Sequence, residues 1–158
     1  MTPPDDHHSS PHKISSASPR LFESDVLDAL SRVHFMTPVI IYSPIILGLA
    51  AYSFTLHSVA VALGWIIAGF AAWSLSEYLG HRWLFHVPLY LPRDWGPLLQ
   101  FLIHGVHHDH PNDRYRLVMP PLLSAPIMLM AFVVALIILG EALTWPALAG
   151  FVFGYLCY

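Results

Sequence analysis

Residues 77–121, EYLGHRWLFHVPLYLPRDWGPLLQFLIHGVHHDHPNDRYRLVMPP, decide the fold, because they interrupt a chain that is otherwise strongly apolar. This stretch holds six of the eleven histidines, and five of the six fall in two tight groups. The groups have the patterns H-x-x-x-x-H and H-x-x-H-H, and they comprise His81 and His86, and His104, His107 and His108. Histidine is the commonest metal ligand in proteins, through a neutral imidazole nitrogen. The stretch therefore predicts a metal site at the face of a membrane bundle.

The second group has the spacing of ligands on one helix. His104, His107 and His108 are placed i, i+3, i+4, which puts all three on one helix face within about 100°. His110 breaks this spacing and precedes a proline, so we leave it out of the ligand set. The charged residues of 109–116 fit a solvated loop that contacts lipid phosphates.

The first group is less regular. Glu77 precedes His81 by four residues, so a carboxylate can orient or join this histidine. His81 and His86 are five residues apart and diverge by about 140° on a regular helix. They can share one site if the helix ends or bulges near Pro88, or they can serve two metals.

The number and type of these side chains limit the kind of site. An all-histidine set without cysteine suits iron, zinc or copper, and the sequence does not choose among them. A catalytic zinc takes three protein ligands, so five histidines exceed one zinc, yet they are too few to fill two six-coordinate ions. The set therefore indicates one part of a two-metal site.

Composition places the chain in a membrane. Apolar residues make up 56% of the chain and charged ones 11%, whereas soluble domains have about 45–50% and about 25%. The 158 residues suffice for one domain of three or four spanning helices. A net charge of −3 without a basic stripe excludes a nucleic-acid-binding protein. The single cysteine, Cys157, excludes a disulfide framework and a cysteine zinc site within this chain.

Uncharged runs flank the histidine block on both sides. Three of them can each cross about 30 Å of hydrocarbon, and they are residues 38–56, 58–76 and 122–139. Residues 57–58 and 140–145 are predicted turns, and 146–158 begin a fourth apolar helix that is too short to cross. The predicted fold is an all-α integral membrane bundle, with three complete spans, an unfinished fourth and a histidine-rich helical cap.

The N-terminal region and the arginines set the orientation. Residues 1–20 are rich in proline, serine and histidine, which predicts a disordered tail. Residues 21–34 have apolar side chains at helical spacing, which predicts a short amphipathic helix on the membrane surface. Lysine and arginine precede the first span or lie between the second and third, and both predicted turns lack them. The positive-inside rule then places the N-terminus and the histidine block in the cytosol.

The histidine groups and their surroundings resemble a known family. EYLGHRWLFH, followed by HGVHHDHPNDRYRLVMPP, is similar to the fatty acid hydroxylase superfamily of membrane histidine-box enzymes. LFESDVLDALSRVHF before the first span and the segment RLVMPP resemble its fatty acid 2-hydroxylase branch. The resemblance covers residues 21–158, which we take as the membrane domain of such an enzyme.

This resemblance implies a four-span domain with a cytosol-facing dinuclear metal centre. Its expected metal is iron, although zinc can occupy such sites, and dioxygen and two electrons hydroxylate carbon 2 of a long fatty acyl chain. The resemblance implies that the metal ligands include His81, His86, His104, His107 and His108. The implied partners are a long-chain fatty acid or ceramide of sphingolipid metabolism, the membrane and a separate electron-transfer protein. The implied location is the endoplasmic reticulum in a eukaryote or the cytoplasmic membrane in a bacterium.

The chain departs from the family in two ways. A haem-containing cytochrome domain, usual before the membrane part of eukaryotic members, is replaced by the tail. The family pattern also continues past the position of Tyr158 into further histidine clusters, so we expect this chain to be C-terminally truncated. Two alternatives follow, which are a non-catalytic metal-binding membrane fragment and a sterol or carotenoid hydroxylase or desaturase of the same superfamily.

Overall fold

The computed structural model describes residues 20, 23–85, 113, 115 and 117–158, and these are the residues discussed below. In chain order, the elements are α1 (Asp25–Ser31), α2 (Met36–Leu56), α3 (Val59–Leu79), the π-helical segment η1 (Gly80–Phe85) and α6 (Pro121–Cys157). This part of the chain is helical and contains no strand. The predicted all-α class is confirmed.

Three segments of the structure are long and apolar enough to cross a membrane. They are Met36–Leu56, Val59–Trp83 and Pro121–Cys157. Many of their side chains face outward, and Ile40, Leu47 and Ile137 are at least 70% exposed. Apolar surface on this scale is unfavourable in water and suits lipid, so the predicted membrane bundle is confirmed.

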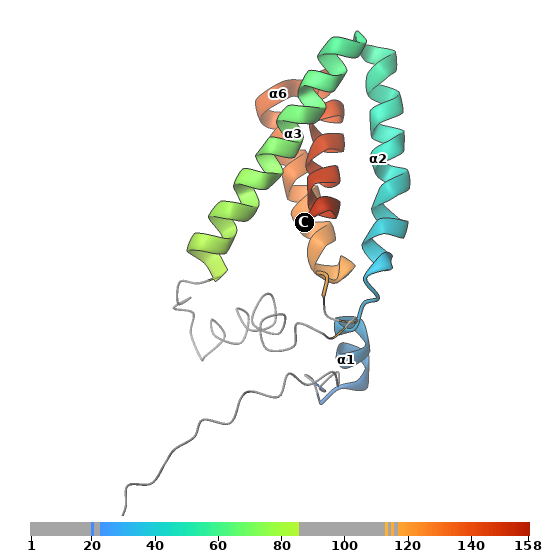
Figure 1. Cartoon of the computed structure of the whole chain (residues 1–158), viewed down its shortest axis with the longest axis vertical. Coiled ribbons are helices and arrows are strands. Elements are labelled where there is room, and N and C mark those ends of the chain that lie inside the picture. The colour runs from blue at the N-terminus through green and yellow to red at the C-terminus, as the bar shows by residue number, and fades with distance from the viewer. Residues whose placement is uncertain (1–19, 21–22, 86–112, 114, 116) are drawn as a thin grey trace, which may run out of the picture.

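The helices run alternately up and down (Figure 1). α2 and α3 form the predicted tight hairpin, because one helix ends at Leu56 and the next begins at Val59. α6 bends at Gly140, where φ is 73°, a left-handed conformation that glycine adopts readily. We call residues 121–139 its first limb and 141–157 its second limb. The imidazole Nε2 of His57 lies 2.8 Å from the carbonyl oxygen of Ala142, so the hairpin tip and the α6 bend meet at one end.

Two predicted boundaries were wrong. The predicted turn over residues 140–145 is confined to Gly140, and the second limb begins at Glu141 instead of Pro146. One left-handed residue reverses the chain there, and the hydroxyl of Thr144 then donates to the carbonyl of Gly140 within the first turn. The second wrong boundary is the end of the span predicted at residues 58–76. The helix continues to Leu79 and then into η1.

The predicted surface helix is shorter than expected. Among the described residues of this segment, 23–34, the helix is limited to the seven-residue α1, and the chain leaves it at Arg32, which adopts an extended conformation. Arg32 pairs with Asp28 one turn earlier, at 2.8 Å. Val26 and Leu30 of α1 are 67% and 50% exposed, which agrees with contact to a membrane surface. The predicted tail, residues 1–20, lies outside the described residues except for Arg20.

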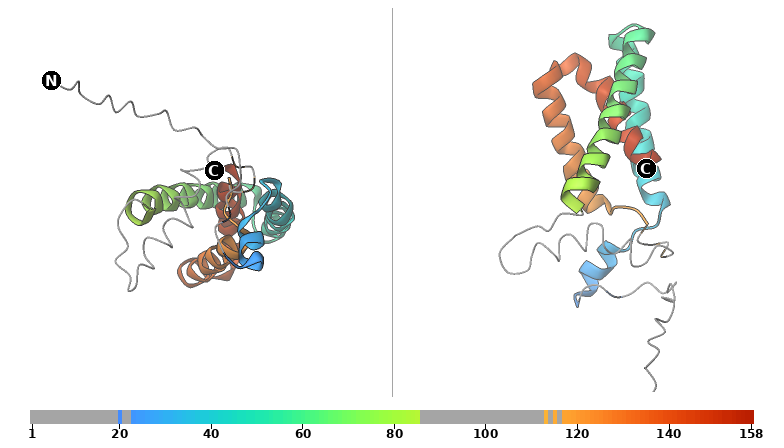
Figure 2. Two further views of the ribbon diagram at one scale, coloured as in Figure 1. Left: turned by 90° about the horizontal axis from the view of Figure 1, so that it is seen from below. Right: turned by 60° about the vertical axis from the view of Figure 1, so that its left-hand side comes forward.

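Glycines bring α6 and α3 together. The second limb lies between α2 and α3, which contact each other much less than each contacts α6 (Figures 1 and 2). A Cβ atom on Gly69 would overlap the Ala147 carbonyl, and one on Gly150 would overlap the Ile66 carbonyl. Small residues let helix backbones approach closely in membranes, so these two glycines fix the crossing.

A buried polar pair lies in the core that the described helices form. Tyr42 is 4% exposed and Ser124 is fully buried, and their hydroxyl oxygens are 2.8 Å apart. Tyr155 packs edge-on against Tyr42 and donates to the carbonyl of Met119 at 3.3 Å. These contacts join α2 and both limbs of α6, because an unpaired hydroxyl in an apolar interior is unfavourable.

We expect Tyr42→Phe to destabilise the bundle modestly. Hydrogen bonds between helices in a membrane contribute about 0.6 kcal/mol on average and at most about 1.7, so a loss of about 1 kcal/mol is the expected result. Thermal unfolding in a mild detergent measures it. Tyr52→Phe is the matched control, because the Tyr52 ring contacts Trp145 but its hydroxyl has no partner among the described residues. Equal stability of the two variants would argue against the Tyr42–Ser124 bond.

Candidate metal centre

His81 is the one predicted ligand whose position the structure describes. It lies in η1, which continues α3 in a wider helix with i to i+5 hydrogen bonds. The side chain is half-buried. Such π-helical turns are rare and occur frequently at functional sites. The sequence allows a helix bulge near Pro88. The structure has a widened helical turn slightly earlier, at Gly80–Phe85, immediately before His86 in the sequence.

Glu77 lies one α-helical turn before His81, in the last turn of α3. Glu77 as a whole residue is half-buried. A nitrogen and an oxygen donor from one helix suit iron or zinc. Among the described residues, no three histidine, cysteine or acidic side chains come together as a metal-binding group. The other four predicted ligands, His86, His104, His107 and His108, lie outside the described residues.

The two other described histidines, His34 and His57, lie in other elements than His81. His57 is at the membrane-hairpin tip, at the opposite end of the bundle from His81 (Figure 1), as the sequence predicts. His34 precedes α2, where its Nδ1 accepts from the backbone N–H of Met36 at 3.2 Å and its ring contacts Phe35 and Tyr115. Neither histidine belongs to the predicted ligand set.

The segment after the second histidine group is anchored to the N-terminal region. Asp113 is only 2% exposed, and its carboxylate accepts from the backbone N–H of Tyr115 at 3.0 Å. The carbonyl of Tyr115 in turn accepts from the backbone N–H of Val33 at 2.8 Å. The prediction of a solvated loop over residues 109–116 is therefore wrong for Asp113. The sequence does contain a signal for this contact. An aspartate side chain often accepts a hydrogen bond from the backbone N–H two residues later and so forms a turn, as Asp113 does with Tyr115.

We expect Asp113→Ala to lower stability by about 1.5–3 kcal/mol, because the variant loses the hydrogen bond between the Tyr115 backbone N–H and a charged acceptor. Thermal unfolding of the purified protein measures this effect. Asp25→Ala is the control, since the Asp25 side chain is 89% exposed and exposed ion pairs contribute about 0–1 kcal/mol. If Asp113→Ala unfolds at the temperature of the control, the anchoring role is disproved.

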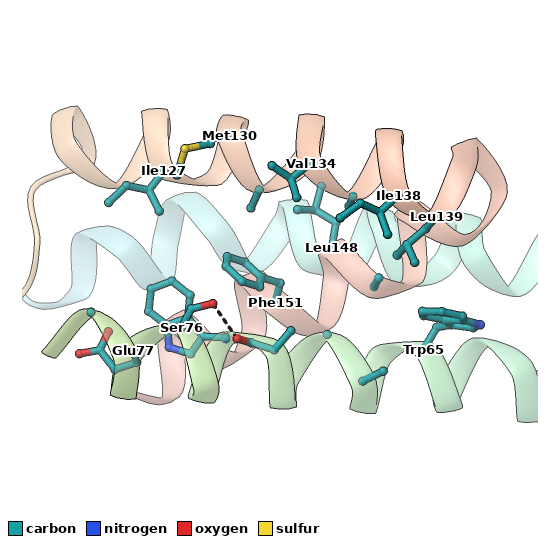
Figure 3. A pocket seen from close by; sticks show the side chains of 18 of the residues that line it. Trp65, Ser76, Glu77, Ile127, Met130, Val134, Ile138, Leu139, Leu148 and Phe151 are labelled. Atoms are coloured by element: carbon teal, nitrogen blue, oxygen red, sulfur yellow. Dashed lines mark hydrogen bonds between the residues drawn. The ribbon is translucent and has the colours of Figure 1, made fainter. Parts of the chain in front are cut away.

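An apolar groove leads away from the His81 end of α3. Its volume is about 660 Å³, and it lies between α3 and the first limb of α6, with Ala147, Leu148 and Phe151 of the second limb behind it. Figure 3 shows Glu77 at one end and Trp65 at the other. Ser76 and Glu77 supply the hydroxyl and the carboxylate among its described lining residues, and the Ser76 hydroxyl already donates to the Ala72 carbonyl. The groove is therefore suited to a long apolar molecule whose polar end lies near Glu77.

Known proteins with similar sequences are lipid hydroxylases. The chain is 37% identical over 142 residues to a dihydroceramide fatty acyl 2-hydroxylase of Arabidopsis thaliana, an alignment that covers 89% of this chain and 59% of the relative. It is 33% identical over 158 residues to the fatty acid 2-hydroxylase of Rattus norvegicus, covering 88% and 42%. The resemblance to fatty acid 2-hydroxylases is confirmed. The chain spans about half the length of these relatives.

A solved structure shares the fold. It is full-length scs7p, of which only the hydroxylase domain is visible, and the TM-score is 0.78 at 30% identity. The match covers 84% of this chain and 50% of the other. No protein-family model matches the sequence. The hydroxylase fold that the resemblance implies is thus supported by a comparison of sequences and by a comparison of structures.

Proposed function

We propose that this chain is part of a membrane enzyme that hydroxylates carbon 2 of long fatty acyl chains. The observation that carries the proposal is the apolar groove that ends at Glu77, one helical turn from the predicted ligand His81. A groove of this kind holds a saturated chain beside the metal ligands without offering it a competing polar group. The similarity to fatty acid and dihydroceramide 2-hydroxylases supports the same reaction.

The proposed centre holds two metal ions, with iron the expected metal and zinc able to bind the same ligands. His81, His86, His104, His107 and His108 are the ligands that this chain would supply. η1 widens the helix over Gly80–Phe85, directly before His86 in the sequence, and we propose that His81 and His86 share one site. Bound iron would supply the activation of dioxygen. One oxygen atom enters the C–H bond at carbon 2 and the other leaves as water, with two electrons and two protons from a separate donor.

The chain's own residues have simpler tasks in this proposal. Glu77 orients the imidazole of His81, as carboxylates commonly do around metal-bound histidine. The groove walls exclude water from the acyl chain. The ends of α2, α3 and α6 that carry the neighbouring arginines lie at one end of the bundle (Figure 1), so we assign that end and the histidine block to the cytosol.

The complete gene product, produced in a host that lacks fatty acid 2-hydroxylase, tests the proposal. Membranes supplied with iron, a reducing system and either a free long-chain fatty acid or a dihydroceramide should yield the 2-hydroxy product, detected by mass spectrometry. The two substrates distinguish a free-acid enzyme from one that acts on ceramide. Absence of the 2-hydroxy product from both substrates would disprove the proposal. Product from a sterol or carotenoid alone would show that the enzyme acts on that class of lipid instead of on fatty acyl chains.

A further inference from the structure

The groove has a defined far end. Trp65, Ile138 and Leu139 line it at the end away from Glu77 (Figure 3), and the Trp65 side chain is half-buried there. Between the two ends, the α3 wall carries Ala68 and Ala72, and their small side chains leave the space that the groove occupies. The wall contributed by α6 is formed by branched and flexible apolar side chains such as Val134 and Met130. The groove is thus apolar, with a large ring at its far end.

The length of the groove can be compared with that of an acyl chain. Glu77 and Trp65 are twelve residues apart on one helix, which corresponds to about 18 Å at 1.5 Å per residue. An extended chain advances about 1.2 Å per bond, a third of the span of one extended residue, so about 15 bonds fit between them. Measuring from His81, which lies four residues after Glu77, adds about 6 Å or about 5 bonds. A chain hydroxylated beside His81 therefore reaches Trp65 at about 20 carbons.

We propose that Trp65 sets the upper limit of acyl-chain length by closing the groove opposite the metal centre. This inference rests on the proposed hydroxylase function and adds a residue that determines specificity. An apolar chain is the occupant that fits, because the described groove has no buried charge along its course and its one carboxylate lies at the metal end. Ala68, Ala72, Met130 and Val134 are exposed in this chain, so the groove is open along its side and an acyl chain can enter from the bilayer.

Two variants test the length limit in opposite directions. Trp65→Ala removes the end wall and should extend the accepted chain length, whereas Ala72→Phe blocks the groove about 7 Å from Glu77 and should shorten it. Pockets discriminate single methylenes by roughly 10- to 200-fold, so we expect the preference between chains of about 16 and about 26 carbons to change at least about tenfold. The complete gene product is given a mixture of saturated acids, and the ratios of 2-hydroxy products are measured.

Matched variants on the same helix control for general damage. Ile67→Ala and Ala71→Phe change exposed residues one or two positions away that do not line the groove, and both should keep the wild-type product ratios. Wild-type activity with unchanged ratios in Trp65→Ala and Ala72→Phe would overturn the inference while leaving the hydroxylase function intact. No product from the wild type with any chain would overturn the hydroxylase function instead.

A crosslinking measurement tests the same inference without requiring catalytic activity, so it also applies to inactive variants. A fatty acid of about 20 carbons with a photoreactive group at its methyl end should crosslink to peptides that contain Trp65 or Ile138. Crosslinks confined to residues that do not line the groove would mean that the acyl chain does not occupy it. That outcome would also overturn the inference.

Discussion

Replacing His81 with alanine is expected to lower formation of the 2-hydroxy product by at least about a hundredfold. Loss of groups that merely orient metal ligands costs about 10- to 100-fold in affinity or activity, and removal of a ligand itself should cost no less. The metal content of the purified protein, measured by mass spectrometry, should fall together with the product. The expected effect is large because His81, in the π-helical turn η1 at the end of α3, is proposed to bind the metal directly.

Two other histidines provide controls for this variant. His57→Ala alters the opposite end of the bundle, and His34→Ala alters an exposed residue before α2. Both should keep their metal and their activity, with at most the small loss expected from one hydrogen bond. An active, metal-loaded His81→Ala protein would remove His81 from the ligand set. Equal inactivity of all three variants, accompanied by a lower unfolding temperature, would show that histidine loss acts through folding.

The sequence predicts the helical scaffold well because charge and length suffice for it. Uncharged runs locate the spans within a few residues, and the two polar residues His57 and Ser58 locate the hairpin tip. The second limb of α6 begins earlier than the sequence predicts. The polar residues Glu141 and Thr144 interrupt the apolar run, and such an interruption suggests a turn. The structure needs only one left-handed glycine there, and the Thr144 hydroxyl is satisfied by the Gly140 carbonyl.

The sequence predicts the candidate site less completely. Histidine spacing predicts His81 as a metal ligand, but no pattern in the sequence indicates that Trp65 or Val134 lines a groove. Amphipathic periodicity reveals a buried face only when the other face is polar. In α3 and α6, the sides that face lipid, protein and groove are all apolar, so only the arrangement of the helices distinguishes them. Asp113 shows the opposite case, in which a charge that suggests solvent exposure is buried by its bond to a backbone amide.

Gly150→Ala is expected to destabilise the bundle by about 3 kcal/mol or more, at the upper end of the range for overpacking. A methyl group at this position meets the carbonyl of Ile66, which belongs to the helix backbone and cannot rotate away as a side chain could. α3 and the second limb of α6 must therefore move apart, and Trp73 loses its close packing on Gly154 one turn further along. Unfolding of the detergent-solubilised protein, followed by heating or by titration with a denaturing detergent, measures the loss.

The matched control for this variant is Gly64→Ala, because no heavy atom lies within 4 Å of the position of its added Cβ. Gly64 is inside α3, where alanine is favoured over glycine by up to about 1 kcal/mol, so this variant should be as stable as the wild type or more so. Gly69→Ala should behave like Gly150→Ala, because its Cβ would meet the Ala147 carbonyl from the other helix. If all three variants were equally stable, the close crossing of α3 and α6 would be disproved, and with it the groove that this crossing forms.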